Sequence, residues 1–368
     1  MRVRVLTLRD FRNYERAEIA FGDSLTVVTG SNGAGKTNLL EALYFGCTGR
    51  SCRTANEREV VRFGAGTTRI TLTVESDDGA HELGVGFEPG QPKRMQLDGA
   101  SVERLLDLDQ RPLVSVFLPD RLELVKGPPA VRRAHLDQFI GAMWPSRVAT
   151  RRAYSQALQQ RNALIARVRA GHGSPASLAT WNLQLAQHGI ALMGDRDRAV
   201  QELSEPFGHL AEELGLDGGA SVAYRPRSKA TTAEALADEL AERTPSDLER
   251  GFSGHGPHRD ELALLRSGRE LRVYGSQGQQ RLALLALLLA ERERIATHRR
   301  SPPLMLLDDV MSELDQLRRQ ALVELLRGVE GQSVISTTDL EHVPGGSDPG
   351  ITRLAVSDGE VRIEELAR

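Results

Sequence analysis

A glycine-rich loop constrains the fold of this 368-residue chain more than any other feature. The stretch GSNGAGKTN fits the pattern G-x-x-x-x-G-K-[ST] at Gly30, Gly35, Lys36 and Thr37. An apolar run, SLTVVT, precedes the loop, and a helix-forming run, TNLLEALYFG, follows it. A strand, a glycine loop and a helix start in this order turn backbone N–H groups and the helix dipole toward phosphate oxygens. The loop therefore predicts a nucleotide phosphate site in an α/β domain.

Each residue type in the loop has an expected task. Lys36 would bridge the β- and γ-phosphates of ATP, and the Thr37 hydroxyl would bind Mg²⁺. A purely structural glycine turn is the alternative, and the strand and helix on either side disfavour it. The residues expected to surround the phosphates are Gly30, Ser31, Asn32, Gly33, Ala34, Gly35, Lys36 and Thr37.

A second apolar run, PPLMLLDDV, ends in Asp308 and Asp309. A buried parallel strand with acids at its C-terminal end delivers rigid carboxylates beside a phosphate loop. We expect Asp308 to hold Mg²⁺, directly or through water, and Asp309 to polarise an attacking water. Lys36, Asp308 and Asp309 are thus the predicted catalytic residues. Taken alone, the run equally fits a strand that meets a turn.

A third segment, YGSQGQQR, places Ser276, Gly278 and Gln279 at the start of a helix. Such a helix start is a second anion-binding element. A helix cap alone would account for Ser276, but not for the two glycines and three glutamines around it.

The chain divides by composition into a β-rich part and a helical part. The first hundred residues alternate like strands, whereas YSQALQQRNALIARV and the segment after residue 200 show helical spacing, with Pro206 expected to kink or interrupt the second helix. Residues 121–170 contain ten Lys and Arg against two acids, and residues 231–250 contain six acids against two arginines. We expect an ATPase head domain formed by 1–119 and 251–368, and a helical insertion, the arm, at 120–250.

Cysteine content and hydropathy predict a cytoplasmic protein. Cys47 and Cys52 occur in a chain without an obvious signal peptide, which favours a reducing compartment. The longest apolar run, LALLALLLA, has about half the length of a membrane span. His255 and His258 form an H-x-x-H pair, but no third ligand lies nearby in the sequence, so a metal site there is disfavoured.

Several blocks together resemble a known family. GSQGQQ resembles the signature motif of ABC-type ATPases, and SELD resembles the loop after their magnesium strand. LRDFRNYE, GSNGAGKTNLLEALYF, FLPDRLELVKGPPAVRRAHLD, GPHRDEL, GSQGQQRLALLALLLAE and LLDDVMSELD occur in the order found in the RecF family, bacterial DNA repair ATPases related to SMC proteins. The blocks reach residue 315 and cover the helical middle thinly.

The resemblance implies a fold and a mechanism. The expected fold is an α/β ABC-type P-loop ATPase head with a β-rich N-terminal subdomain and an inserted helical arm. Two chains would form an ATP-dependent homodimer that traps two ATP molecules, with Ser276, Gly278 and Gln279 of one chain touching the γ-phosphate held by the other. Arg12 and Asn32 would also reach the phosphates, although Arg12 equally fits a surface arginine.

The implied activity is a weak, DNA-stimulated ATPase of recombinational repair and replication restart. The dimer would clamp DNA at gaps or junctions without sequence preference and recruit RecR, and through it RecO and RecA. Two departures from ABC ATPases bear on this activity. Asp309 replaces the usual glutamate, which predicts slow hydrolysis, and VISTTD offers Thr337, Thr338 and Asp339 where those proteins have a histidine.

The basic segment supplies candidate DNA contacts. Arg132, Arg133, Arg151 and Arg152 on a helical arm would neutralise phosphates without reading bases. From charge alone, a solvated helix face explains them equally well. We expect two further arginines of the segment, Arg147 and Arg161, to belong to this group.

Two other classes of protein share parts of the pattern. The ATPase subunit of an ABC transporter has the same loop and signature, but the basic insertion and the FRNYE block disfavour it. A small-molecule P-loop kinase would leave the signature helix without a purpose.

Overall fold

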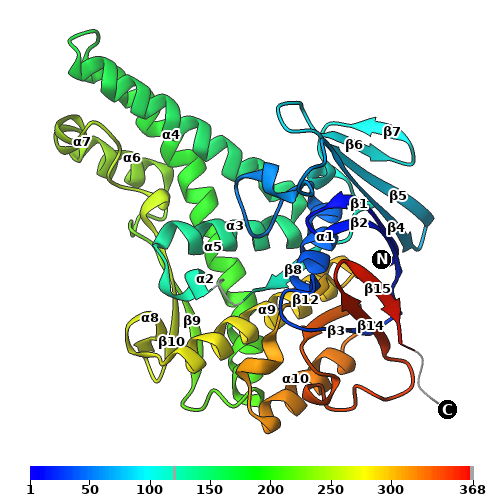
Figure 1. Ribbon diagram of the computed structural model, residues 1–368. Helices are drawn as coiled ribbons and strands as arrows, with labels where there is room; N and C mark the ends of the chain where they lie inside the picture. Colours follow the sequence, from blue (N-terminus) through cyan, green and yellow to red (C-terminus); the bar gives the residue numbers. More distant parts are fainter. Residues whose placement is uncertain (119–121, 365–368) are drawn as a thin grey trace. The chain divides into compact units, whose positions relative to one another are not determined.

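The computed structural model describes residues 1–118 and 122–364 (Figure 1). The chain packs as two compact units, one formed by Met1–Arg121 with Ile295–Arg368 and the other by Leu122–Arg294. We call them the first and second unit and describe each by itself.

Two six-stranded sheets form the frame of the first unit. One sheet is antiparallel throughout, in the order β2 (Tyr14–Ala20), β1 (Arg2–Phe11), β4 (Thr68–Ser76), β5 (Gly79–Phe87), β6 (Arg94–Leu97) and β7 (Ala100–Val102). The other has the order β15 (Glu360–Ile363), β14 (Thr352–Ser357), β3 (Leu25–Thr29), β13 (Ser333–Thr337), β12 (Leu304–Leu307) and β8 (Val114–Phe117). Its strands are parallel except for β15.

One helix packs against both sheets. Helix α1 (Lys36–Thr48) contacts β4 and β5 of the antiparallel sheet and β13 of the parallel sheet. Its apolar residues, among them Leu39, Leu43 and Phe45, share one buried cluster with side chains from both sheets. The central strands β3, β12 and β13 are buried along their whole length, which matches the continuous apolar runs of the sequence. Helix α10 (Gln316–Gly328) follows β12.

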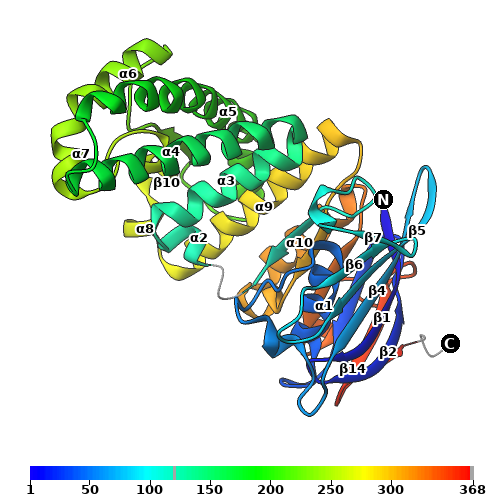
Figure 2. The same ribbon diagram turned by 90° about the horizontal axis from the view of Figure 1, so that it is seen from above.

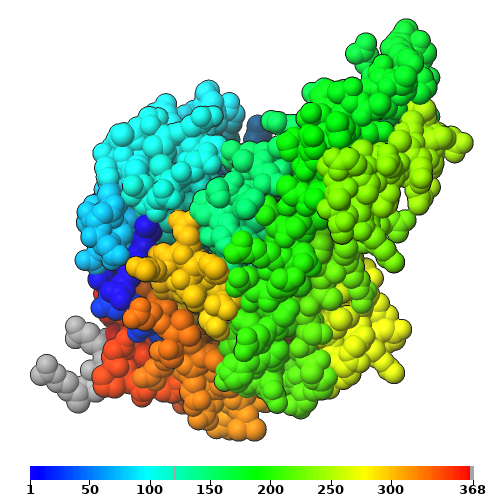
Figure 3. All heavy atoms as spheres, turned by 180° about the vertical axis from the view of Figure 1, so that it is seen from behind, coloured from blue at the N-terminus to red at the C-terminus, as the bar shows by residue number. Residues whose placement is uncertain are grey.

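The second unit is mainly helical. Its elements are α2 (Glu123–Lys126), α3 (Pro129–Met143), α4 (Val148–Arg169), α5 (Leu178–Glu213), α6 (Ala233–Glu242), α7 (Thr244–Arg250), α8 (Leu271–Tyr274) and the start of α9 (Gln277–Arg299). A small antiparallel sheet joins them, in the order β11 (Arg269–Glu270), β10 (Glu261–Arg266) and β9 (Ala220–Arg225). In the space-filling view the green surface of α5 continues into the yellow-green surface of α6, against which it packs (Figure 3).

Two sequence expectations about this unit need revision. The expected arm ended at residue 250, but residues 251–294 pack with 122–250, because β10 pairs with β9 inside the expected arm. Helix α5 is also not interrupted at Pro206, which lies buried within it. The apolar face that surrounds this proline, with Leu203, Phe207 and Leu210 buried, outweighs the loss of one backbone hydrogen bond.

Candidate functional site: a phosphate loop and its acidic strand

The loop between β3 and α1 has the backbone that its glycines predict. Gly30, Gly33 and Gly35 all have positive φ, at 154°, 86° and 121°. A Cβ on Gly30 would lie 2.4 Å from the Val356 carbonyl oxygen, and one on Gly35 would lie 2.5 Å from Asn13 Nδ2. Only glycine therefore fits at Gly30 and Gly35 without displacing a neighbour.

The helix start that follows the loop has no side-chain cap among the described residues. The N-cap residue of α1 is Gly35. The first N–H groups of a helix have no partner within the helix itself, and they attract anions. This is the arrangement that the sequence predicts for phosphate binding.

Lys36 lies folded back over the loop. Its Nζ donates to the carbonyl oxygens of Gly30 at 2.7 Å and Ser31 at 3.0 Å. Only 7% of the residue is exposed, and this burial lowers the pKa of Lys36, against the attraction of Asp309 and Asp308. A desolvated ammonium group at the mouth of an anion site gains strongly from a phosphate partner.

The predicted magnesium residues lie in contact. Thr37 Oγ1 donates to the carboxylate of Asp308, with distances of 3.0 and 2.8 Å to its two oxygens. A further residue, Ser336 at the end of β13, donates from Oγ to Asp308 Oδ1 at 2.6 Å. The site thus joins the start of α1 with the ends of the neighbouring strands β12 and β13.

Asp309 has an unusual backbone and an unsatisfied carboxylate oxygen. Its φ is 45°, in the left-handed region, and its N–H donates to Ser336 Oγ at 2.9 Å. Its Oδ1 is buried and has no hydrogen-bond partner among the described residues. Strained backbone and unsatisfied polar atoms concentrate at functional sites, so this carboxylate fits a role toward a water or a ligand.

These oxygens suit a hard divalent cation. A carboxylate, two hydroxyls and an unsatisfied carboxylate oxygen meet beside the phosphate loop, and Mg²⁺ prefers such ligands together with phosphate oxygens and water. Clusters of three or more His, Cys, Asp or Glu that could hold a metal ion are absent from the described part of the chain. A cation here would therefore depend on the nucleotide for several of its ligands.

Arg12 sits beside this site in a defined position. It lies in the tight turn between β1 and β2 with φ of 52°, and its guanidinium binds Glu41 of α1 through two bonds of 2.9 and 2.8 Å. Glu41 is fully buried and also accepts from Ser51 Oγ and Arg53. Arg12 is therefore not a plain surface arginine, while its predicted contact with phosphate stays a prediction.

The loop is also braced from the β1–β2 turn. Asn13 Nδ2 donates to the carbonyl oxygen of Ala34 at 3.0 Å, and the Tyr14 hydroxyl donates to that of Gly35 at 2.9 Å. Asn32, at the outer part of the loop, is exposed. Sequence reasoning missed Asn13 and Tyr14, which lie in the FRNYE block, and Glu41, which lies on α1.

The signature segment forms a capping box in the second unit. The Gln279 N–H donates to Ser276 Oγ at 3.3 Å, and the Ser276 N–H donates to Gln279 Oε1 at 2.9 Å, at the start of α9. Ser276 and Gly278 are exposed, and so are Val273 and Tyr274 just before them. The cap leaves the hydroxyl proton of Ser276 without an acceptor among the described residues.

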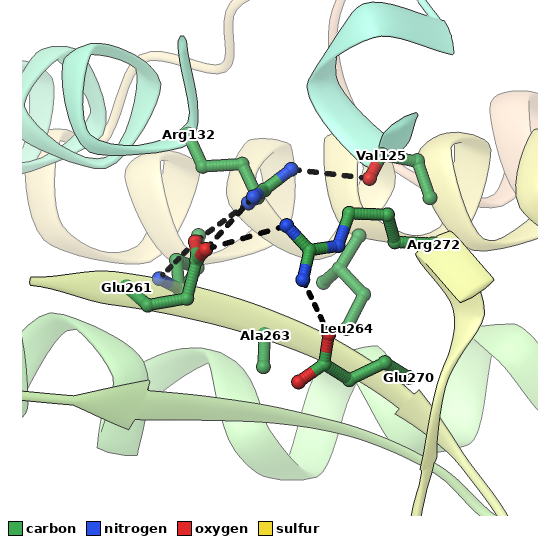
Figure 4. Close-up of a pocket in the computed structure, with 8 residues that line it drawn as sticks. Val125, Arg132, Glu261, Ala263, Leu264, Glu270 and Arg272 are labelled. Atoms are coloured by element: carbon green, nitrogen blue, oxygen red, sulfur yellow. Dashed lines mark hydrogen bonds and ion pairs between the residues drawn. The ribbon is translucent and has the colours of Figure 1, made fainter. Parts of the chain in front are cut away.

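The candidate DNA contacts differ in accessibility. Arg132 is 3% exposed; Nε and Nη2 donate to Glu261 at 2.7 and 2.9 Å, and Nη1 donates to the carbonyl oxygens of Val125 and Gly127. Figure 4 shows it reaching into a pocket whose lining includes Val125, Arg132, Glu261, Leu264, Glu270 and Arg272. Burial and ion pairing therefore argue against Arg132 as a DNA contact.

The other arginines of the segment divide in the same way. Arg161 is fully buried and bound to Asp247, so it is excluded as well. Arg133 is half-buried and donates to the Asp260 carbonyl oxygen, while Arg151 and Arg152 are exposed. Arg133, Arg151 and Arg152 stay predictions.

The remaining candidate groups have structural partners. His255 Nε2 contacts Glu239 at 2.6 Å, and His258 lies between the Tyr154 hydroxyl at 2.7 Å and the Ser253 carbonyl oxygen at 2.8 Å. Cys47 is a buried thiol, and this burial raises the pKa of Cys47 to about 12. A membrane-spanning helix would need a longer apolar stretch than any helix in the described ranges provides.

Comparison with known proteins agrees with this geometry. The profile of a family described as "RecF/RecN/SMC N terminal domain" matches residues 2–347. The DNA replication and repair protein RecF of Anaeromyxobacter sp. (strain Fw109-5) is 37% identical, and the match covers 98% of this chain and 99% of the relative. The protein of the same description from Chloroflexus aurantiacus is 36% identical over the same shares.

Solved structures confirm the expected fold class. A structure of the recombination mediator protein RecF with ATP in the RecFOR pathway aligns with a TM-score of 0.86 and 25% identity, covering 99% of this chain and 98% of that one. An Smc head bound to the C-winged helix domain of ScpA has the same fold at a TM-score of 0.64 and 17% identity. With a matching family profile, relatives above 30% identity over nearly the whole length and the phosphate loop with its acidic strand in place, the chain belongs to the RecF family.

Proposed function

We propose that this chain is an ATP-dependent DNA-binding protein of replication and recombinational repair. One observation carries the ATP part of the proposal. The hydroxyls of Thr37 and Ser336 both bind the carboxylate of Asp308 at the phosphate loop, so three elements converge on the place where a nucleotide-bound cation belongs. The names of the relatives support the biological setting.

ATP is the proposed cofactor, with Mg²⁺. The N–H groups of residues 30–37 bind the phosphates, and Lys36 exchanges its carbonyl partners for phosphate oxygens. Thr37 and Asp308 hold the cation, and Ser336 fixes the orientation of Asp308. The cation neutralises charge on the β- and γ-phosphates when bound.

Hydrolysis is proposed to be slow. Asp309 orients the attacking water through its buried, unsatisfied Oδ1. Its side chain is one methylene shorter than the glutamate usual in ABC-type ATPases, so the water lies less well aligned with the γ-phosphate. A weak ATPase, stimulated by DNA, suits a clamp that opens after a delay.

The proposed active form is a homodimer with ATP at its interface. Ser276, Gly278 and Gln279 lie at a helix start at which Ser276 and Gly278 are exposed. The Gly278 N–H and the serine hydroxyl proton, which the capping box does not use, can bind a γ-phosphate held by another chain. Each chain then contributes half of two nucleotide sites. ATP closes the dimer on DNA at gaps or junctions, and hydrolysis opens it.

The proposed partners follow from the pathway named for the structural relative. RecR binds the closed form, and RecO acts through it. RecA, which acts downstream, follows from the family resemblance alone. The alternative, an ABC transporter subunit, would require that the chain co-purify with a membrane permease.

DNA binding measured by fluorescence anisotropy tests the proposal. The protein is titrated into labelled gapped DNA with ATP and Mg²⁺, with ADP, and without nucleotide, each at two salt concentrations. We expect the tightest binding with ATP, and we expect Lys36→Ala to abolish the difference between nucleotides. Equal binding in all three states would contradict the proposal.

A further inference from the structure

A row of arginines crosses the antiparallel sheet of the first unit. Cross-strand register places Arg9 on β1 opposite Arg16 on β2 and opposite Arg69 on β4. Arg69 is in turn opposite Gly86 on β5, and Gly86 is opposite Arg94 on β6. We call Arg16, Arg9, Arg69 and Arg94 the arginine row; it runs across five adjacent strands.

The row lies on the face of the sheet that points away from the core. Leu8 and Ile70, the sequence neighbours of Arg9 and Arg69, are fully buried in the cluster that includes α1. Side chains alternate along a strand, so the row points to the opposite face. Figure 2 shows α1 on one side of this sheet only, and all four arginines are exposed.

The arginine row has almost no acidic partner within the chain. Arg9 approaches its neighbour Asp10 at 4.0 Å, and its side chain is 79% exposed. Arg16, Arg69 and Arg94 form no ion pair with any carboxylate of the described residues. Like charges directly opposite each other destabilise a sheet, so folding alone gives no reason for three arginines in register.

Gly86 interrupts the row where a side chain would fit. A Cβ built there would meet only atoms of Arg94, its Cβ at 3.8 Å and its carbonyl oxygen at 4.0 Å, which are ordinary contact distances. The φ of Gly86 also lies outside the positive region that demands glycine. Glycine in the interior of a strand weakens the strand, and it marks places where a ligand or another backbone approaches closely. The row therefore has a flat gap between Arg69 and Arg94.

We propose that the arginine row binds the phosphate backbone of DNA, an inference that rests on the proposed DNA-binding function. At about 4.8 Å between strands, the row is roughly 19 Å long. Phosphates of one strand follow each other at about 3.4 Å along the duplex axis, so the row spans about five or six of them. Gly86 lets the backbone approach the sheet between arginines, and the Thr7 and Thr71 hydroxyls flank the row as further donors.

This surface reads charge and not sequence. Guanidinium groups on a flat sheet face bind phosphates from the side and place no element in a groove. The contacts lie within the first unit alone, which distinguishes them from the arm arginines predicted from charge.

A salt titration of DNA binding tests the row. Two variants remove the same charge: a row variant, Arg9→Gln/Arg16→Gln/Arg69→Gln, and a control variant, Arg300→Gln/Arg327→Gln/Arg362→Gln, at arginines of the first unit outside the row. The slope of log K against log salt falls by about 0.9 in magnitude for every phosphate contact that a variant removes. We expect the slope of the row variant to fall by about 3 and that of the control variant to stay within about 1 of wild type.

A second variant tests the close approach, and ATP binding checks folding. Threonine has a higher strand propensity than glycine, so the melting temperature of Gly86→Thr should stay the same or rise. DNA binding should weaken several-fold, because the added side chain fills the gap that the DNA backbone approaches. All variants should bind a fluorescent ATP analogue like wild type.

The outcomes separate this inference from the proposed function. If wild type binds no DNA, the proposed function fails and the row fails with it. If wild type binds DNA and the row and control variants give equal slopes, the row is refuted and the proposed function stands. The inference would also be refuted if the row variant lost binding to polyglutamate but kept the wild-type salt dependence of DNA binding. That result would assign the surface to an acidic protein partner.

Discussion

Ser336→Ala tests how the acidic strand is held. The Ser336 hydroxyl donates to Asp308 at 2.6 Å and accepts from the Asp309 N–H at 2.9 Å, and the residue is fully buried. A hydrogen bond to an ionised group contributes about 1.5–3 kcal/mol. Because about 1.4 kcal/mol is tenfold in affinity, we expect ATP to bind about ten- to a hundredfold more weakly in the presence of Mg²⁺.

A residue of the same strand supplies the control. Ser333 is 1% exposed, and its Oγ has no hydrogen-bond partner among the described residues, so Ser333→Ala removes a hydroxyl without removing a contact to the site. Affinity is measured with a fluorescent ATP analogue over a range of Mg²⁺ concentrations. Without Mg²⁺ both variants should bind like wild type. Equal Mg²⁺ dependence in the two variants would refute the role given to Ser336.

Two predictions concern the second unit. Arg161→Met should lower the free energy of unfolding by about 3–5 kcal/mol, measured in urea, because it leaves Asp247 as a buried charge without its partner at 2.7 Å; a loss below about 1 kcal/mol would contradict this pairing. Burial lowers the pKa of His258 to about 4, so between pH 6.5 and 4 the unfolded chain binds a proton at His258 that the folded chain does not. The free energy of unfolding should therefore fall by about 3 kcal/mol as the pH drops from about 6.5 to 4. In His258→Gln, the free energy of unfolding should change less with pH over this range. The same pH dependence in wild type and variant would contradict the role given to His258.

The nucleotide half of the site could be predicted from sequence because its parts are local. Lys36 and Thr37 belong to the loop motif itself, and Asp308 directly follows a strand with a continuous apolar sequence. Ser336 could not be found in this way. Its contact depends on β13 lying next to β12 in the sheet, and strand order is not written in either segment. Once β13 is known to lie beside β12, their parallel register predicts the contact between Ser336 and Asp308.

Charge counts were a poorer guide than motifs. The basic segment looked like one surface, but Arg132 pairs with Glu261, 129 positions away. Sequence distance hides such partners, so net charge cannot separate a buried ion pair from a binding surface. The arginine row shows the reverse case, a basic surface that the charge counts did not indicate. Its members lie on four different strands, and only the strand register brings them together.

Mixing two inactive variants tests the central claim, that one chain completes the ATP site of another, most directly. Lys36→Ala destroys the phosphate loop and Ser276→Arg blocks the helix start, so each variant alone should hydrolyse almost no ATP. In a mixed dimer, the intact loop of the Ser276→Arg chain faces the intact Ser276 of the Lys36→Ala chain. If half of the dimers are mixed and each has one working site, the mixture should recover about a quarter of the wild-type rate. A mixture as inactive as its components, although mixed dimers form, would contradict the claim.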